Sequence, residues 1–342
     1  MFIDEKVLKL RLIIIGLGSI GRRHLYNVNS LFPDANIGIF RPTLRFQEPI
    51  ADDNVIFRSL DEALKWDPHG VIICTPASTH CEFATPFLKL GIPVFIEKPI
   101  SVSFKEAQKM AAICPNPQVL VGYNLRFNWS LLKAKQLLEM GAVGQVLTVK
   151  VEVGQYLPSW RPGGDYRNSV SAKKHLGGGV ILELSHELDL IYWLFGLPDQ
   201  VVAVGGAFGP LELDDDVEDM AAIILKYEAA PYLVTIGLDF YQQPPGRSCK
   251  FVGSEGTLIW DYMENEVALF SVESGGWKRY RSNETSDKNH MYRRELLHFV
   301  DCVTGKVPPL CSVHDACNVL ALVEAIRVSI ARDTVVRMED VC

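Results

Sequence analysis

Residues 10–24 read LRLIIIGLGSIGRRH, an apolar run of strand length that leads directly into Gly16, Gly18 and Gly21. Gly16 permits a tight turn, Gly18 lets the backbone approach a pyrophosphate, and Gly21 allows the following helix to pack closely. The N-terminus of that helix would present aligned N–H donors to the phosphates. The residues expected to contact a dinucleotide here are Gly16, Gly18, Ser19, Ile20 and Gly21. The alternative is a glycine-rich turn that binds nothing.

The first part of the chain alternates short apolar runs with helical patterns, which is typical of a parallel sheet covered by helices. Helix-start signals stand between the runs, at Ser59-x-x-Glu62 and Ser103-x-x-Glu106. The expected strands are Leu10–Ile15, Ile37–Phe40, Val71–Cys74, Val94–Ile96 and Val119–Val121. We therefore predict a doubly wound α/β domain of the Rossmann type over residues 1–123.

The pattern changes after this domain. Residues 146–153 alternate apolar and polar side chains, which indicates a strand with one wet face. Further strand-like stretches follow near residues 201–206, 220–227, 232–240, 249–253, 257–260 and 266–271. Helical periodicity returns near residues 292–303 and 320–330. Residues 124–342 are thus expected to form an α+β domain with a large, mostly antiparallel open sheet that binds substrate and supports oligomer formation.

Composition narrows the class of partner. Hydrophobic residues make up 48% of the chain and charged residues 22%, as in ordinary globular proteins. The formal net charge of -7 argues against a broadly basic nucleic-acid surface. No apolar run reaches the roughly 18 residues that span a bilayer, and the first residues do not resemble a secretion signal. We expect a cytoplasmic protein with a small-molecule partner, no nucleic acid and no membrane.

The eight cysteines are scattered along the chain, with no C-x-x-C pair and no histidine spacing typical of a zinc site. Free cysteine is often simply a small buried hydrophobic side chain. We therefore expect reduced thiols and no metal.

The position that usually recognises the cofactor ribose is unusual. In NAD-binding domains an acidic residue about 20 positions beyond the glycines holds the ribose hydroxyls. Here that place is taken by Phe40 and Arg41. Arg41, with Thr43 and Arg45, could accept a 2′-phosphate through charge-assisted hydrogen bonds, which favours NADP. Arg41 could instead stack on the adenine, an arrangement that suits NAD or NADP.

The segment 71–101, VIICTPASTHCEFATPFLKLGIPVFIEKPIS, resembles the T-P-x-x-x-H and E-K-P stretches of the Gfo/Idh/MocA oxidoreductases. That family includes glucose-fructose oxidoreductase and inositol dehydrogenase. The resemblance continues along nearly the whole chain, through GYNLRFN at residues 122–128, WRP at 160–162, YRNSVSAKKHLGGG at 166–179, HELD at 186–189 and GSEGTL at 253–258.

The resemblance implies a nicotinamide cofactor, NAD or NADP, with the Glu97-Lys98-Pro99 turn beneath its ring and a Lys–Pro bond that is often cis. The residues that it places around the cofactor are Thr75, Pro76, His80, Glu97, Lys98, Trp160 and Arg161. His80 could instead only cap or pack on its helix, since histidine is used in many ways.

Lys98 is the expected centre of the chemistry. Oxidising an alcohol requires a base for the hydroxyl proton while hydride leaves the carbon, and the reverse reaction requires an acid. An ammonium in a partly desolvated cleft, or near other positive charge, becomes easier to deprotonate. The resemblance implies that Lys98 is this general acid/base. Without it, a lysine directly after a strand would be interpreted as a solvated surface charge.

A second functional segment, GGGVILELSHELDLIYWLFG at residues 177–196, predicts a helix from about Val180 with Glu183 and His186 on one face. His186 could relay a proton, and Glu183 could orient a sugar by accepting from its hydroxyls. A buried, hydrogen-bonded histidine is the alternative. Many family members carry Asp and His four residues apart, whereas Leu182 occupies the Asp position here, so the role of Glu183 stays open. The expected substrate contacts are Asn124, Arg126, Tyr166, Arg167, Glu183, His186 and Tyr292.

Three functions follow as hypotheses. The first is an NAD(P)-dependent dehydrogenase or reductase acting on the CH–OH groups of a sugar, polyol or nucleotide-sugar derivative, with Lys98 as general acid/base assisted by His186. The second is a catalytically silent cofactor sensor of the same fold. The third is a redox-neutral epimerase with a tightly bound cofactor. The resemblance also implies a homodimer or homotetramer.

Overall fold

The computed structural model describes residues 9–42, 54–113, 118–161, 163–229, 232–282, 287 and 289–341. The chain divides into two compact units, each made of several stretches of sequence. The first comprises residues 1–101, 105–122 and 289–313, and the second comprises residues 102–104, 123–288 and 314–342. The single boundary near residue 123 that the sequence predicts differs from these units chiefly at residues 289–313, which return to the first.

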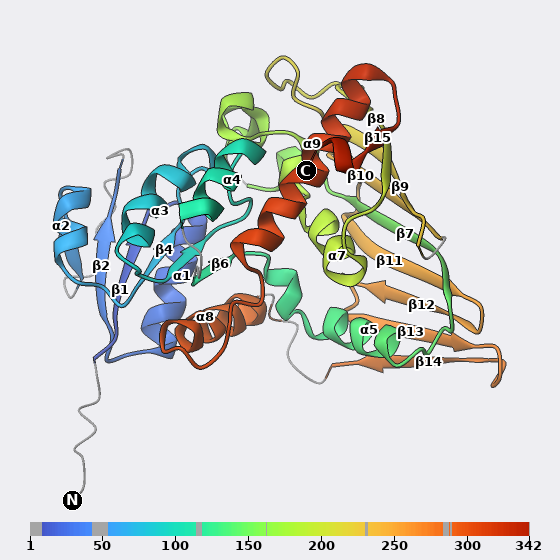
Figure 1. Ribbon diagram of the computed structural model, residues 1–342, viewed down its shortest axis with the longest axis horizontal. Coiled ribbons are helices and arrows are strands. Elements are labelled where there is room, and N and C mark those ends of the chain that lie inside the picture. Colours follow the sequence, from blue (N-terminus) through green and yellow to red (C-terminus); the bar gives the residue numbers. More distant parts are fainter. Residues whose placement is uncertain are drawn as a thin grey trace, which may run out of the picture. The chain divides into compact units, whose positions relative to one another are not determined.

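The first unit contains a six-stranded sheet in the order β3-β2-β1-β4-β5-β6, in which every neighbouring pair is parallel (Figure 1). Its strands are β1 Arg11–Ile15, β2 Asn36–Phe40, β3 Val55–Phe57, β4 Gly70–Ile73, β5 Val94–Ile96 and β6 Val119–Val121. Residues 12–15 are fully buried, as expected where helices cover both faces of a parallel sheet. The predicted doubly wound Rossmann domain is confirmed.

The strand order reverses between β1 and β4, and ligands of open α/β sheets bind at the carboxyl ends of the strands at such a reversal. The helices of this unit are α1 Ser19–Leu31, α2 Leu60–Lys65, α3 His80–Lys89, α4 Phe104–Ile113 and α8 Asn289–Val303. The expected start signal of α2 is present, because Ser59 Oγ accepts a hydrogen bond from Glu62 N at 3.2 Å. Helix α8 packs against α1.

The second unit contains a nine-stranded sheet in the order β14-β13-β12-β11-β7-β10-β9-β8-β15. Neighbouring strands are antiparallel except β7 and β10, which are parallel. The strands are β7 Val146–Gly154, β8 Gln200–Gly206, β9 Met220–Tyr227, β10 Tyr232–Asp239, β11 Gly246–Gly253, β12 Gly256–Asp261, β13 Glu266–Ser271, β14 Gly276–Arg281 and β15 Val336–Arg337. The predicted large, mostly antiparallel sheet is confirmed, and β14 and β15 add to the expected strands.

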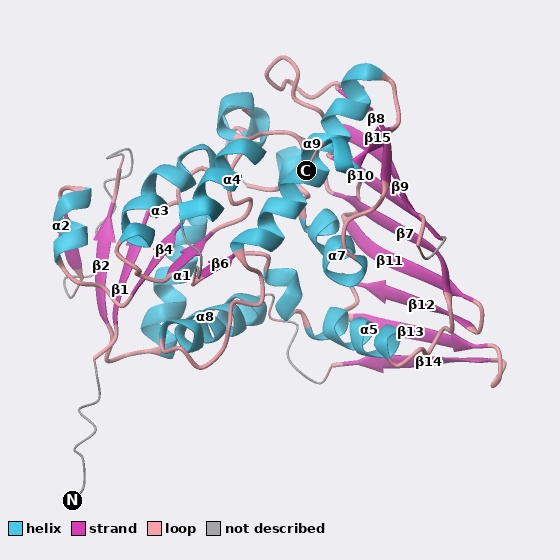
Figure 2. Cartoon of the chain, viewed as in Figure 1, coloured by secondary structure: helices cyan, strands magenta, loops and turns pink. Residues whose placement is uncertain are grey.

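Helices of the second unit cover one face of this sheet (Figure 2). They are α5 Trp129–Glu139, α6 Val180–Glu183, α7 His186–Phe195 and α9 Val313–Arg332. Short 3-10 helices span Ala77–Thr79 in the first unit and Asn124–Phe127, Leu157–Ser159, Tyr166–Asn168, Val170–Ala172, Lys174–Leu176 and Met338–Asp340 in the second. Trp260 is fully buried on the covered face, whereas the opposite face exposes Val202, Val204, Ile224 and Leu233.

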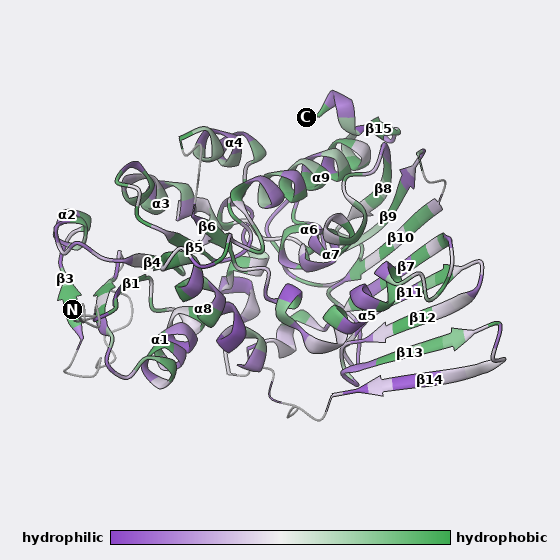
Figure 3. Cartoon of the chain, turned by 60° about the horizontal axis from the view of Figure 1, so that its bottom comes forward, coloured by the Kyte–Doolittle hydropathy of each residue, from purple (hydrophilic) through white to green (hydrophobic). Residues whose placement is uncertain are grey.

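Strand β14 forms one edge of the nine-stranded sheet and is largely hydrophilic (Figure 3). Its Arg279 and Arg281 both pair with Glu266 of the neighbouring strand β13. Charged edge strands resist pairing with the edges of other chains. This edge is therefore protected against aggregation.

Within the part of the chain that the structure describes, no helix is both long and apolar enough to cross a membrane. Over the same residues no three His, Cys, Asp or Glu side chains gather so as to hold a metal ion. The described cysteines are free thiols, and most of them are buried. Cys114 and Cys342 lie outside the described residues.

Candidate functional site

The glycine-rich turn follows β1 in the first unit. Gly16 has a φ of +89°, and a Cβ atom there would lie 3.0 Å from the Cys74 carbonyl group. A Cβ on Gly21 would lie 2.1 Å from the Gly16 carbonyl oxygen, so only glycine allows α1 to begin so close to the strand. A Cβ on Gly18 would meet nothing within 4 Å, and no side chain caps the helix that starts at Ser19. The turn thus has a tight inner side and an open outer side, which fits a pyrophosphate group.

The position expected to recognise the ribose lies at the carboxyl end of the neighbouring strand. Arg41 directly follows β2 and is half-buried. The carbonyl oxygen of Phe40 accepts a hydrogen bond from Gly16 N at 3.0 Å, which places the start of this loop beside the glycine-rich turn. Thr43 and Arg45, the other two expected phosphate contacts, lie outside the described residues.

His80 joins two of the expected cofactor segments. Its Nδ1 atom is 2.9 Å from the Pro99 carbonyl oxygen and its Nε2 atom is 2.8 Å from that of Thr75. The side chain is buried, and burial lowers the pKa of His80, while its contacts with the backbone carbonyls act in the opposite direction. Both ring nitrogens are therefore engaged by the backbone. Pro76 lies within the loop that this bridge closes, immediately before Ala77–Thr79.

Lys98 directly follows β5, and the Lys98–Pro99 peptide bond is cis. Its backbone N donates to Glu97 Oε2 at 3.3 Å. The other carboxylate oxygen of Glu97 lies 2.6 Å from His24 Nε2, and the His24 side chain is fully buried. Glu97 thus faces the interior beneath the turn.

His24 lies just beyond the glycine-rich motif and matches no functional pattern of its own. It stands three positions after Gly21, so the first turns of α1 carry it to the base of the Lys98 turn. Tyr292 of α8 lies edge-on to His24, with a ring separation of 6.2 Å, and 4.4 Å from the Arg23 guanidinium. This expected substrate contact thus belongs to the first unit, outside the expected substrate domain.

In the second unit a pocket of about 120 Å³ gathers several predicted residues. Its lining includes Trp160, Arg161, Tyr166 and Ser169. Trp160 is fixed at its base, because its Nε1 donates to the Gln155 carbonyl oxygen at 3.2 Å and its ring packs edge-on against Phe240. Ser169 also lines this pocket, and its hydroxyl oxygen is buried without a hydrogen-bond partner among the described residues. No sequence signal singles out Ser169.

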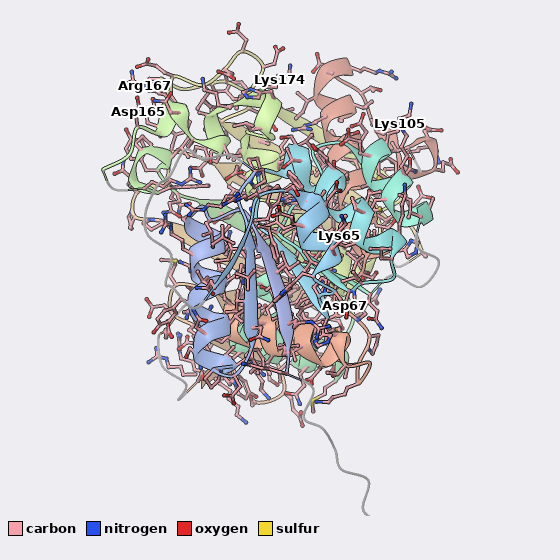
Figure 4. All side chains as sticks on the ribbon, turned by 90° about the vertical axis from the view of Figure 1, so that its left-hand side faces the viewer. Lys65, Asp67, Lys105, Asp165, Arg167 and Lys174 are labelled. Carbon is pink, nitrogen blue, oxygen red and sulfur yellow. The ribbon has the colours of Figure 1, made fainter. Side chains whose placement is uncertain are left out.

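The guanidinium group of Arg167 is engaged by two acidic side chains of the protein. The Arg167 side chain is half-exposed and lies beside Asp165 (Figure 4), with which it pairs at 2.9 Å. It also pairs with Glu212 at 3.2 Å. The neighbouring Tyr166 hydroxyl accepts a hydrogen bond from Glu212 N at 3.1 Å. These contacts hold the loop over residues 165–168 in place.

A helix begins at Val180 as expected, but it does not continue to His186. Helix α6 ends at Glu183 and α7 begins at His186, because hydrogen bonds from Ser185 N to the Leu182 oxygen and from Glu187 N to the Leu184 oxygen tighten the chain between them. Glu183 and His186 thus belong to different helices. Glu183 accepts a hydrogen bond from Ser171 Oγ at 2.9 Å. His186 lies edge-on to the Tyr123 ring at 5.6 Å.

Asn124 and Arg126, both expected to contact substrate, are buried in the second unit. Arg126 is 2% exposed and donates from Nη2 to Asp189 Oδ1 at 2.7 Å and from Nε to Asp189 Oδ2 at 3.1 Å. Burial raises the pKa of Asp189, and the charge of Arg126 opposes that shift. The guanidinium therefore compensates a buried carboxylate, and its donors point into the protein.

Two family models match most of the chain. Residues 10–125 match the NAD-binding Rossmann fold of the Gfo/Idh/MocA oxidoreductase family. Residues 135–338 match the C-terminal alpha/beta domain of the same family.

Three known proteins illustrate the range of relatives. Myo-inositol 2-dehydrogenase of Thermotoga maritima is 24% identical over 97% of this chain and 99% of its own. The NAD(+) scyllo-inositol 2-dehydrogenase of Bacillus subtilis is 24% identical over 91% of each chain. A 2,7-anhydro-N-acetylneuraminate hydratase of Mediterraneibacter gnavus is 30% identical over 49% of this chain and 45% of its own.

Solved structures share the fold over the whole chain. The WlbA dehydrogenase from Bordetella pertussis, in complex with NADH and UDP-GlcNAcA, has a TM-score of 0.79 at 21% identity and covers 96% of this chain and 98% of its own. A levoglucosan dehydrogenase in complex with NADH and levoglucosan has a TM-score of 0.83 at 18% identity, covering 96% of this chain and 99% of its own.

Replacing Arg126 with alanine leaves the buried Asp189 without its partner, so we expect the free energy of unfolding to fall by about 3–5 kcal/mol. Chemical denaturation followed by circular dichroism measures this loss. Lys135→Ala is the matched control, because it removes a more exposed cation over the same Trp193 ring and should cost less than about 1 kcal/mol. Equal losses in the two variants would contradict a stabilising role for the buried pair.

Proposed function

Because the chain belongs to the Gfo/Idh/MocA oxidoreductase family, we propose that it is an NAD(P)-dependent dehydrogenase or reductase acting on the CH–OH group of a sugar, polyol or nucleotide-sugar derivative. The observation that carries the proposal is the position of Lys98. It follows β5 of the dinucleotide-binding sheet, in the same unit as the glycine-rich turn, and its neighbour Glu97 is held by His24. The inositol dehydrogenases and the structures with bound sugars support the substrate class.

In this proposal Lys98 moves the proton. During oxidation its Nζ accepts the hydroxyl proton of the substrate as the C–H bond breaks, and during reduction it returns that proton to the carbonyl oxygen. The nicotinamide, when bound, supplies the acceptor or donor of the hydride. His186 assists by hydrogen-bonding the same oxygen, and Glu183 accepts a bond from a further substrate hydroxyl.

The remaining predicted residues divide into contacts and supports. Trp160 and Arg161, in the pocket of the second unit, are proposed to contact the nicotinamide end, and Tyr166 in the same pocket to contact substrate. Arg126 and Arg167 are assigned to supporting the protein, because their donors are already taken by carboxylates. We also propose a homodimer or homotetramer formed through the open sheet face that exposes Val204 and Ile224.

Lys98→Met is expected to lower turnover by about 10²–10⁴-fold, because it removes the general acid/base. NADH affinity, measured by fluorescence titration, should stay within about threefold of the wild type. Turnover is followed by reduced-nicotinamide absorbance with myo-inositol, scyllo-inositol, levoglucosan and UDP-sugars. Lys105→Met, which removes an exposed lysine of α4, is the control. Near-normal turnover of Lys98→Met would exclude this mechanism.

Arg41 is proposed to favour NADP by binding its 2′-phosphate. Arg41→Ala should weaken NADPH binding about tenfold or more, because it removes a charge-assisted contact, and leave NADH binding nearly unchanged. Parallel fluorescence titrations of both nucleotides measure this. Tighter binding of NADH than NADPH by the wild type, with no effect of the substitution on either, would contradict the preference.

A second function is redox-neutral conversion with a retained cofactor, favoured by the relative named a hydratase, since adding or removing water is no net oxidation. The dehydrogenase proposal predicts that dialysed protein requires added NAD(P) for turnover. Mass spectrometry of the purified protein, before and after dialysis, measures bound nucleotide. Retained nucleotide together with product formation at constant reduced-nicotinamide absorbance would favour the second function.

A further inference from the structure

One face of α8 packs against α1 and β5, because Tyr292 and Phe299, about one turn on either side of Glu295, contact the rings of His24 and Phe95 at 6.2 and 5.8 Å. Three buried polar side chains lie in this part of the first unit, beneath the candidate catalytic turn. They are His24 of α1, Glu97 at the end of β5 and Glu295 of α8, and we call them the buried acid cluster. His24 and Glu295 are fully buried, and Glu97 is 9% exposed. Helix α8 is fastened to α1 beside the cluster, where Asn27 and Asn289 exchange side-chain hydrogen bonds of 3.0 and 2.7 Å.

The two carboxyl groups of the cluster differ in their hydrogen-bond partners. Glu97 has His24 Nε2 at 2.6 Å and the backbone N of Lys98 at 3.3 Å. Neither oxygen of Glu295 has a hydrogen-bond partner among the described residues. His24 Nδ1 also has none, so a proton placed there would be buried without an acceptor. The ring proton therefore belongs on Nε2, where it is donated to Glu97.

Two neighbouring carboxylates in so buried a place cannot both carry a charge at low cost. The carboxylate and thiol groups that face Glu295 are Glu97 from β5 and Cys74 from the end of β4, and neither supplies positive charge. The third titratable group of the cluster is His24 of α1, whose Nε2 atom is engaged by Glu97 at 2.6 Å. Burial, with a smaller contribution from the charge of Glu97, raises the pKa of Glu295 well above its ordinary value. Glu97 has two neighbouring nitrogen atoms, His24 Nε2 and the backbone N of Lys98, whereas Glu295 has no hydrogen-bond partner among the described residues.

The cluster and its neighbour Cys74 adjoin the two segments that the proposed reaction needs, the glycine-rich turn and the Lys98 turn. Cys74 lies next to the glycine-rich turn, since a Cβ on Gly21 would approach its Cβ to 3.3 Å. Glu97 immediately precedes Lys98, and the opposite side of its carboxylate is closed by Gly122, where a Cβ would lie 3.1 Å from Oε2. A change of charge at Glu295 would therefore act on the cofactor turn and on the Lys98 turn together.

We propose that Glu295 is a positioning residue: as a neutral carboxyl group it lets the His24–Glu97 pair brace the Lys98 turn, and its ionisation at alkaline pH loosens the turn and weakens cofactor binding. This inference rests on the proposed function for the identity of the cofactor. The sign follows from electrostatics. Loss of the proton places a second negative charge beside Glu97, and the repulsion is relieved when the turn moves away from α8.

The protonation of Glu295 is tested first, by infrared spectroscopy without any ligand. Wild-type protein near neutral pH should show the carbonyl band of a protonated carboxylic acid that Glu295→Gln lacks. Asp301→Asn, which neutralises a partly exposed carboxylate of the same helix paired with Lys306, should retain that band. If Glu295→Gln does not fold, Glu295→Asp replaces it and should shift the band. An unchanged band in the Glu295 variant overturns the proposal.

The coupling to the cofactor is tested by titrating NADH, whose reduced ring carries no charge, from about pH 7 to about pH 9.5. The wild type and Asp301→Asn should lose affinity about fivefold or more as Glu295 ionises, whereas Glu295→Gln, which stays neutral, should change by less than about twofold. The same pH dependence in all three proteins overturns the coupling. Failure of the wild type to bind either NADH or NADPH at any pH refutes the proposed function, while the infrared result still decides the state of Glu295.

Discussion

The close approach of helix α1 to the end of strand β1 is the contact on which the first unit depends. Its tightest point is Gly21 against the Gly16 carbonyl oxygen, where a side chain of any size would push the helix away. The approach leaves the first N–H groups of α1 open towards a ligand. It also fixes His24, further along the helix, against Glu97. The same backbone contact therefore shapes the dinucleotide turn and positions His24 against Glu97, the residue before Lys98.

Much of the first unit can be predicted from the sequence because its signals are local. A strand of a parallel sheet is buried on both faces and appears as a continuous apolar run, and the glycine spacing follows directly after such a run. Strand β3 has no such signal, since it has three residues and exposes Val55 and Ile56 at the sheet edge. No sequence signal predicts that Glu97 and Glu295 are neighbours, because the two residues come from distant parts of the chain and only the packing of α8 brings them together.

In the second unit, the candidate site is even harder to predict from the sequence. Alternation along its strands predicts the sheet, but the candidate site consists of short helices and turns whose paths depend on distant partners. Arg126 looks like a cleft residue from its motif, yet Asp189, 63 positions away, takes its donors. Glu183 and His186 have helical spacing, yet the chain tightens between them. Ser169 stands within the family-like stretch at residues 166–179, yet nothing there distinguishes it from its neighbours, and only the folded chain places it in the pocket wall.

The return of residues 289–313 to the first unit makes the two units inseparable by a single cut. A chain ended after residue 122 would lack α8 and would expose the surface of α1 on which that helix packs. It would also leave His24 and Glu97 without their buried neighbour. The dinucleotide-binding unit is thus complete only after residues 123–288 of the second unit have been synthesised, so during translation α8 is added to it only when the chain is nearly full length.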